Sequence, residues 1–204
     1  MTMIVRDLLI QDQIKAQRSE TGADRYDEVW DGVYVVSPLP NDEHQELVQG
    51  LGFVLHNVVI LPKLGLVRPG VNVSDRDQDW TQNYREPDVV VYLNGTKAIN
   101  RGTHWVGGPD FAVEILSPGD AARQKLDFYA KVGVRELLIV DRDPWALELY
   151  RLDRGLLAMV GKVTPDDGQD LVSEVLPLRF GLVAGEARPA ITATHSDGNR
   201  CWSI

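Results

Sequence analysis

Residues 110–141 read DFAVEILSPGDAARQKLDFYAKVGVRELLIVD, which is an apolar run, a polar break, an amphipathic segment and a second apolar run. The two apolar runs, Asp110 to Leu116 and Glu136 to Val140, have the length and composition of buried strands. The segment between them reaches Val132 and is followed by Gly133, a residue type that commonly ends a helix. This stretch therefore predicts a strand, a helix and a second strand.

On both sides of this unit the sequence predicts short strands and one further helix. Asp31-Gly32 is a turn signal that predicts a hairpin over residues 26–36. Apolar residues at helical spacing predict a helix that starts at Asn41 or Asp42 and ends near Val59. Further strands are expected at residues 66–67, 71–73, 88–93, 146–152 and 156–163, with a last apolar segment at 171–182. This order predicts an α+β fold with a mixed β-sheet flanked by helices.

The chain of 204 residues has the length of one domain. We expect a single domain over residues 1–182, in which residues 1–25 form an N-terminal arm or helix, followed by a polar C-terminal tail over 183–204. Hydrophobic residues make up 44% and charged residues 25%, which excludes a disordered or fibrous chain. The single cysteine, Cys201, excludes an internal disulfide and a structural cysteine-zinc site.

The net charge of −9 argues against a general polyanion binder, because phosphate contacts require Lys and Arg. Residues 117–135 nevertheless hold four basic and two acidic side chains, so a local basic surface remains open. No apolar run reaches the ~20 residues of a membrane span. Residues 1–18 lack the apolar core of a secretory signal. We therefore expect a cytoplasmic protein without a membrane partner.

Two carboxylates stand where the surrounding strand is apolar. Asp88 opens a strand directly after Pro87, and Glu114 lies in the middle of Phe111 to Leu116. A buried carboxylate is costly unless another group pairs with it, and such groups gather at functional sites. The alternative is an edge strand on which Glu114 faces solvent.

A lysine and a histidine fall on helix faces that are otherwise apolar. At 100° per residue, Lys125 lies at the centre of the apolar side of the predicted helix 120–132. The helix directly follows the Glu114 strand, so we expect the Lys125 ammonium to face Glu114 and Asp88. The alternative is a lysine that extends past small neighbours into solvent. His44 lies on the apolar face of the earlier helix, either as a core residue or as a member of the same site.

Together these residues resemble the Uma-two family of restriction-endonuclease-like proteins, within the PD-(D/E)XK nuclease superfamily. The matching pieces, over roughly residues 26–182, are Glu28-Val-Trp-Asp-Gly32, Ser37-Pro38 with His44 following, Glu86-Pro-Asp88, Val113-Glu-Ile-Leu-Ser-Pro118, Lys125-Leu-Asp-Phe-Tyr129 and Gly133-Val134. The resemblance implies a restriction-endonuclease-like fold and a metal-dependent endonuclease that hydrolyses phosphodiester bonds of DNA. The superfamily lysine stands two residues after the acidic residue, where this chain has Leu116. The resemblance places its counterpart on the following helix, at Lys125.

The resemblance also implies roles for individual residues. Asp88 and Glu114 would hold Mg²⁺, for which Mn²⁺ can substitute, with the backbone carbonyl of Ile115 as a third ligand. Lys125 would orient or deprotonate the attacking water or stabilise the developing charge. Two auxiliary candidates are His44 and Glu28. We expect a homodimer, because cleavage of a duplex usually involves two active sites.

The polar loop from Ser74 to Glu86 is long enough to be functional and carries two aromatic residues, a type that can stack on bases. The candidate nucleic-acid-binding residues are Arg76, Trp80, Tyr84, Arg85 and Arg123. The alternatives are that the aromatic rings pack against the sheet or a second subunit, and that the arginines are ordinary surface residues.

Two other functions compete with the endonuclease. One is a catalytically silent module that binds nucleic acid or protein on a nuclease fold, which the net charge favours. The other is a metal-dependent hydrolase of a small phosphate ester, which a compact pocket beside Asp88 would favour.

Overall fold

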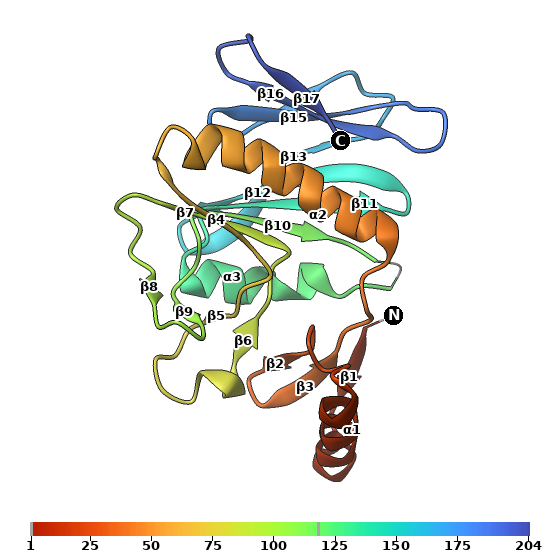
Figure 1. Ribbon diagram of the computed structural model, residues 1–204, viewed down its shortest axis with the longest axis vertical. Helices are drawn as coiled ribbons and strands as arrows, with labels where there is room; N and C mark the ends of the chain where they lie inside the picture. Colours follow the sequence, from red (N-terminus) through yellow and green to blue (C-terminus); the bar gives the residue numbers. More distant parts are fainter. Residues whose placement is uncertain (1, 118) are drawn as a thin grey trace.

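The computed structural model describes residues 2–117 and 119–204, which form three β-sheets and three α-helices (Figure 1). A six-stranded sheet lies at the centre. Its strands, in spatial order, are β13 (Leu156–Val163), β12 (Trp145–Asp153), β11 (Glu136–Arg142), β10 (Phe111–Ile115), β7 (Val89–Leu93) and β4 (Gly65–Pro69). Strands β10 and β11 are parallel and are joined through a helix, whereas the other neighbours are antiparallel. The expected mixed sheet and its strand–helix–strand unit are confirmed.

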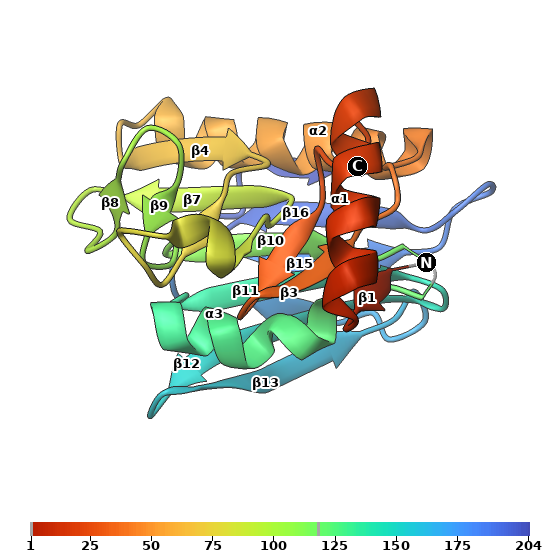
Figure 2. The same cartoon turned by 90° about the horizontal axis from the view of Figure 1, so that it is seen from below.

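Helices α2 (Asp42–Leu55) and α3 (Leu126–Val132) cover opposite faces of this sheet (Figure 2). Alternate residues of β10 point to opposite faces. Phe111 and Val113 pack in the core that contains α2, whereas Ala112 packs in the core that contains α3. Glu114 has the same parity as Ala112 and therefore lies on the α3 face.

Each central helix joins a turn of a different helical type at one end. The side chain of Asn41 caps α2 by accepting the backbone N–H of His44 at 3.0 Å. Beyond Leu55 the helix continues as a π-helical turn, His56–Ile60, close to the expected end. The helix expected over 120–132 starts as a 3₁₀ turn, Ala122–Lys125, and becomes α-helical from Leu126.

A seven-stranded sheet brings the N-terminal hairpin to the α3 side of the molecule. Its strands, in spatial order, are β1 (Met3–Val5), β3 (Val33–Val36), β2 (Glu28–Trp30), β6 (Tyr84–Arg85), β5 (Val73–Ser74), β9 (Trp105–Val106) and β8 (Ile99–Asn100). The predicted hairpin is confirmed, and its turn places Asp31 and Gly32 at positive φ. Helix α1 (Leu8–Thr21) lies at the outer edge of this sheet (Figure 1).

The expected polar tail over 183–204 is wrong, because this segment forms strands of a third sheet. That sheet contains, in order, β14 (Asp170–Val172), β15 (Leu178–Val183), β16 (Ala190–His195) and β17 (Cys201–Ser203). It packs against α2 on the side away from α3 (Figure 1), and Ile191 and Ala193 are fully buried in the α2 core. The expected domain boundary at residue 182 is therefore also wrong. No helix in the described ranges is long and apolar enough to cross a membrane.

Candidate active site

The strand pairing brings the two predicted carboxylates together. In the antiparallel pair β7–β10, Val89 lies opposite Val113, so the next residues along, Asp88 and Glu114, are cross-strand neighbours. One carboxylate oxygen of Asp88 accepts the backbone N–H of Ile115 at 2.6 Å, which fixes Asp88 at the end of the sheet.

Lys125 reaches Glu114 from the turn that precedes α3, and its second partner is Glu28, whereas the expectation from sequence was Asp88. Its Nζ donates to Glu114 Oε1 at 3.0 Å and to Glu28 Oε1 at 2.9 Å, and its side chain is 10% exposed. Tyr129, one turn further along, also donates its hydroxyl to Glu114. Burial alone would lower the pKa of Lys125, but Glu114 and Glu28 raise it above its ordinary value. The lysine is therefore held as a charged ammonium.

Glu28 extends the cluster from β2, on the second sheet. Besides Lys125, it accepts the backbone N–H of Glu86 at 2.8 Å and the indole N–H of Trp30 at 2.6 Å. Glu86 stands two residues before Asp88, and burial together with the charges of Glu28 and Asp88 raises its pKa to about 7. The site thus concentrates more negative charge than Lys125 neutralises.

His44 lies on α2, across the cavity from the α3 side. Its Nε2 is 2.9 Å from Asp88 Oδ1, so the ring fixes the carboxylate oxygen that Ile115 leaves free. The other ring nitrogen of His44, Nδ1, is buried and has no hydrogen-bond partner among the described residues. The ring of His44 therefore joins the carboxylate cluster of the cavity through Asp88.

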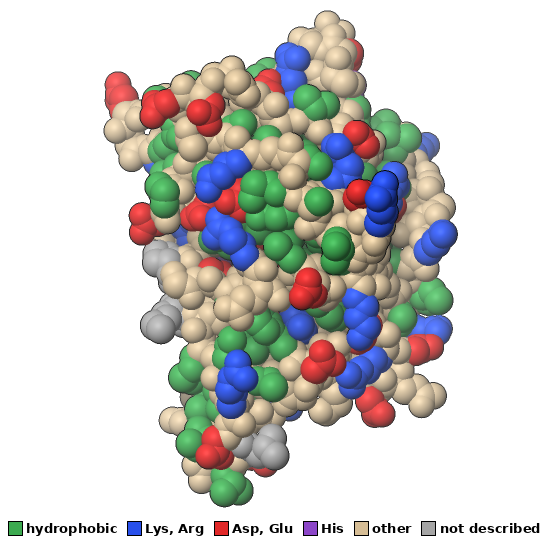
Figure 3. All heavy atoms as spheres, turned by 180° about the vertical axis from the view of Figure 1, so that it is seen from behind, with side chains coloured by type: hydrophobic (Ala, Val, Ile, Leu, Met, Phe, Trp, Pro, Cys, Tyr) green, Lys and Arg blue, Asp and Glu red, His purple; other side chains and the backbone are tan. Residues whose placement is uncertain are grey.

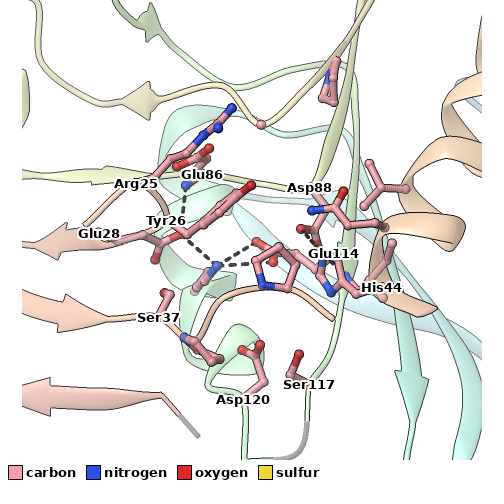
Figure 4. Close-up of a pocket in the computed structure, with 18 residues that line it drawn as sticks. Arg25, Tyr26, Glu28, Ser37, His44, Glu86, Asp88, Glu114, Ser117 and Asp120 are labelled. Carbon is pink, nitrogen blue, oxygen red and sulfur yellow. Dashed lines mark hydrogen bonds and ion pairs between the residues drawn. The ribbon is translucent and has the colours of Figure 1, made fainter. Parts of the chain in front are cut away.

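All of these carboxylates, with Lys125 and His44, line one cavity of about 330 Å³ (Figure 4). Five acidic and two basic side chains line it. Part of the wall is apolar, formed by Pro38, Pro40, Val48 and Pro69. The site is a compact pocket lined by residues of α2, of the turn before α3 and of two sheets.

The donor set of the cavity fits Mg²⁺. Mg²⁺ is commonly held by one or two carboxylates and keeps several waters, and Asp88 and Glu114 supply that pair. Ile115, whose carbonyl is the expected third ligand, also lines the cavity. Within residues 2–117 and 119–204, no three His, Cys, Asp or Glu side chains are grouped closely enough to hold a metal alone.

The predicted phosphate-binding arginines all lie outside this cavity. Arg85 is 5% exposed, and its guanidinium lies over the rings of Phe128 and Trp30, so its prediction as a phosphate contact is wrong. Arg123 pairs with Asp141 and Glu148, and Arg76 pairs with Asp31. On the described part of the face drawn in Figure 3, Lys and Arg form no continuous basic surface.

The two aromatic candidates also contact other protein groups. Trp80 stacks on His104 with ring centroids 4.8 Å apart, and it meets Tyr84 edge-on. The Tyr84 hydroxyl donates to the backbone carbonyl of Asp27 at 2.9 Å. These contacts support the alternative in which the rings pack against the protein.

The residues in or beside the cavity that were not singled out from the sequence include Arg25, Tyr26, Glu86, Asp120 and Tyr129, the last of which contacts Glu114. Glu86 and Tyr129 stand inside motifs that were recognised, two residues before Asp88 and four after Lys125, so their spacing offered a signal. Nothing in the sequence distinguishes Arg25 from other surface arginines.

The topology and this cavity define an α+β protein of the restriction-endonuclease-like class. The Uma2 family, described as "Putative restriction endonuclease", matches residues 13–185, and the chain belongs to this family. The fold is also similar to a crystal structure from Anabaena variabilis described as a putative nuclease belonging to DUF820. That match has a TM-score of 0.59 and 17% identity, and it covers 73% of this chain and 82% of the other. No curated protein matches the chain.

Proposed function

We propose that this chain is a Mg²⁺-dependent nuclease that hydrolyses phosphodiester bonds of DNA, with Asp88, Glu114 and Lys125 as its catalytic residues. The observation that supports this most is the 3.0 Å contact of Lys125 Nζ with Glu114, next to Asp88 in one cavity. A buried ion pair contributes little net stability compared with apolar residues of similar size. The family and the fold both support the nuclease class.

Each residue has a distinct task in this reaction. Asp88 and Glu114 would hold the metal, and a bound metal would supply a water of lowered pKa and polarise the phosphate. Lys125, kept as an ammonium by its two carboxylate partners, orients the attacking water and stabilises charge that develops on the phosphate. His44 keeps Asp88 in position through its 2.9 Å contact.

Cleavage of DNA oligonucleotides with Mg²⁺ or Mn²⁺ tests this assignment. We expect Glu114→Gln to abolish activity at every pH, because it removes a charged metal ligand. Lys125→Ala leaves the ligands in place, so we expect a small residual activity that rises with pH as hydroxide becomes more abundant. Lys125→Ala also leaves Glu28 and Glu114 without their cation, which destabilises the fold. Urea unfolding of each variant therefore checks that the loss of activity is not a loss of folded protein.

Three outcomes of this experiment would contradict the proposal. Full activity in both variants would trace the cleavage to a contaminant. Equal and total loss in both, with folding intact, would leave Lys125 without a separate role in activating water. No cleavage by the wild type on DNA or RNA, with either metal, would favour the silent binding module.

A hydrolase of small phosphate esters is a second candidate, and the compact cavity of about 330 Å³ favours it. The ratio of kcat/KM for an oligonucleotide to that for a simple phosphodiester discriminates between the two. The expected homodimer and the cytoplasmic location stay predictions, and sedimentation equilibrium measures the first.

A further inference from the structure

The reacting groups are largely buried, which favours a substrate that can enter the cavity. The side chains of Glu114 and Lys125 are only 6% and 10% exposed, at the bottom of a cavity of small-molecule size. To bring its scissile phosphate to these groups, a strand must let one nucleotide enter the cavity, and in a duplex this nucleotide must leave the stack at a cost of a few kcal/mol, which is least when the strand is already single. The cavity therefore suits an unpaired nucleotide.

Arg25 offers this pocket a cation that forms no ion pair among the described residues, although its charge acts on Glu86 nearby. It lines the cavity and is exposed, just before β2. The other basic side chain of the cavity, Lys125, is held by Glu28 and Glu114. Among the described residues Arg25 has no carboxylate partner, and Figure 4 draws no ion pair between it and Glu86. A guanidinium without a carboxylate partner can bind a phosphate.

Tyr26 supplies an aromatic ring beside that cation. Arg25 Cζ lies 5.7 Å from the centre of the Tyr26 ring, and Tyr26 is half-buried in the cavity wall. Aromatic rings beside a basic group are the usual platform for an unpaired base. The aromatic pair expected from sequence, Trp80 and Tyr84, is instead packed against the protein.

We propose that Arg25 and Tyr26 form a binding subsite for one unpaired nucleotide of single-stranded DNA, with Arg25 on a phosphate and Tyr26 stacked on a base. This inference rests on the proposed function and names its substrate as single-stranded rather than duplex DNA. Such a substrate needs only one active site, so the subsite does not depend on a dimer.

Binding of a fluorescently labelled single strand, measured by anisotropy with Ca²⁺ in place of Mg²⁺, tests the subsite directly. The same sequence annealed to its complement is the comparison, and we expect it to bind at least ~10-fold more weakly. We expect Arg25→Ala to weaken single-strand binding about 10-fold. It should also make the slope of log affinity against log salt shallower by ~0.7, the contribution of one phosphate.

Conservative variants separate the subsite from a loss of structure. Tyr26→Ala is expected to weaken single-strand binding at least ~5-fold, whereas Tyr26→Phe keeps the ring and the affinity. Arg154→Ala removes an arginine that is 93% exposed at the β12–β13 turn, far along the chain from the cavity, and should change nothing. If Arg25→Ala and Tyr26→Ala both bind like Arg154→Ala, the subsite is wrong.

Cleavage of the same two substrates with Mg²⁺ separates this inference from the proposed function. We expect the single strand to be cut at least ~10-fold faster than the duplex. Equal or faster cutting of the duplex would overturn the inference and leave the nuclease standing. Binding that depends on Arg25 and Tyr26 without cleavage of either substrate would overturn the nuclease and keep the subsite. Neither binding nor cleavage would overturn both.

Discussion

Lys125 shows how one buried charge can organise a site. Its ammonium joins Glu28 from the second sheet to Glu114 from the central sheet, at 2.9 and 3.0 Å. Two carboxylates sharing one ammonium in a dry environment demand a fixed geometry, because any shift leaves a charge unpaired. The same contacts hold Glu114 where its strand neighbour Asp88 can share a cation with it.

His44 is expected to affect activity through Asp88 alone. We predict that His44→Ala lowers both DNA cleavage and Mn²⁺ affinity about 10–100-fold, as is usual when the partner of a metal-binding carboxylate is lost. Titration calorimetry with Mn²⁺ measures the affinity, and the exposed His56→Ala on the same helical segment is the matched control. Unchanged Mn²⁺ affinity in His44→Ala would show that His44 is only a core residue.

For single residues, the sequence predicted which side of a helix a residue occupies better than which groups it contacts. Lys125 was placed correctly because 100° per residue fixes which side of a helix a residue occupies. Arg85 was placed wrongly, since its burial between Trp30 and Phe128 depends on rings from β2 and α3. Arg25 was missed because only the folded chain shows which cavity arginine forms no ion pair with the other described residues.

Among the elements, Glu148 on β12 ties the turn before α3 to the central sheet. It accepts from Arg123 at 2.9 Å and from Lys162 on β13 at 3.0 Å, and the Tyr150 hydroxyl donates to it at 2.9 Å. Burial alone would raise the pKa of Glu148, but these hydrogen bonds lower it to about 2. The ionised carboxylate is thus more stable in the folded chain than in the unfolded chain.

This depressed pKa makes the stability of the protein pH-dependent in a defined direction. The contribution of Glu148 is present above its ordinary pKa of 4.5 and is lost as the pH falls from about 4.5 towards 2. We predict that Glu148→Gln lowers the free energy of unfolding by ~1–3 kcal/mol at pH 7 and by progressively less below pH 4.5. Urea unfolding at several pH values measures the difference.

The exposed Asp153→Asn, at the end of the same strand, is the control for Glu148→Gln and should show no such trend. A difference between wild type and Glu148→Gln that stays constant from pH 7 to pH 3 would mean that the hydrogen bonds do not depend on ionisation.

The elements that were predicted well are those with long apolar runs, such as β10, β11 and the helix between them. The strand β16 was missed because its sequence, AITATH, alternates only small or moderately apolar residues with polar ones. Two of its side chains, Ile191 and Ala193, complete a core that other elements supply. A pattern this weak becomes a strand only when a neighbouring strand and a core are already present.

For the molecule as a whole, the site lies where separate parts of the fold meet. Its carboxylates come from β2 and β10 and from the segment that leads into β7, its lysine from the turn before α3 and its histidine from α2. Sequence spacing identified several of these residues singly, but their union in one pocket depends on the sheet order. With a net charge of −9, the proposed binding of DNA would depend on this local arrangement rather than on a general attraction.

The third sheet should unfold together with the rest of the molecule, although residues 183–204 read as a tail. Phe180 on β15 is fully buried and stacks on Phe111 of β10, with ring centroids 5.9 Å apart. We predict that Phe180→Ala lowers the free energy of unfolding by ~3–5 kcal/mol in a single cooperative transition, because it opens a cavity between two sheets. Val183→Ala, at a 52% exposed position on the same strand, should cost far less. Tryptophan fluorescence and circular dichroism in urea measure both variants. Two separate transitions, with the larger one unaffected by Phe180→Ala, would show that the third sheet folds independently of the core around β10.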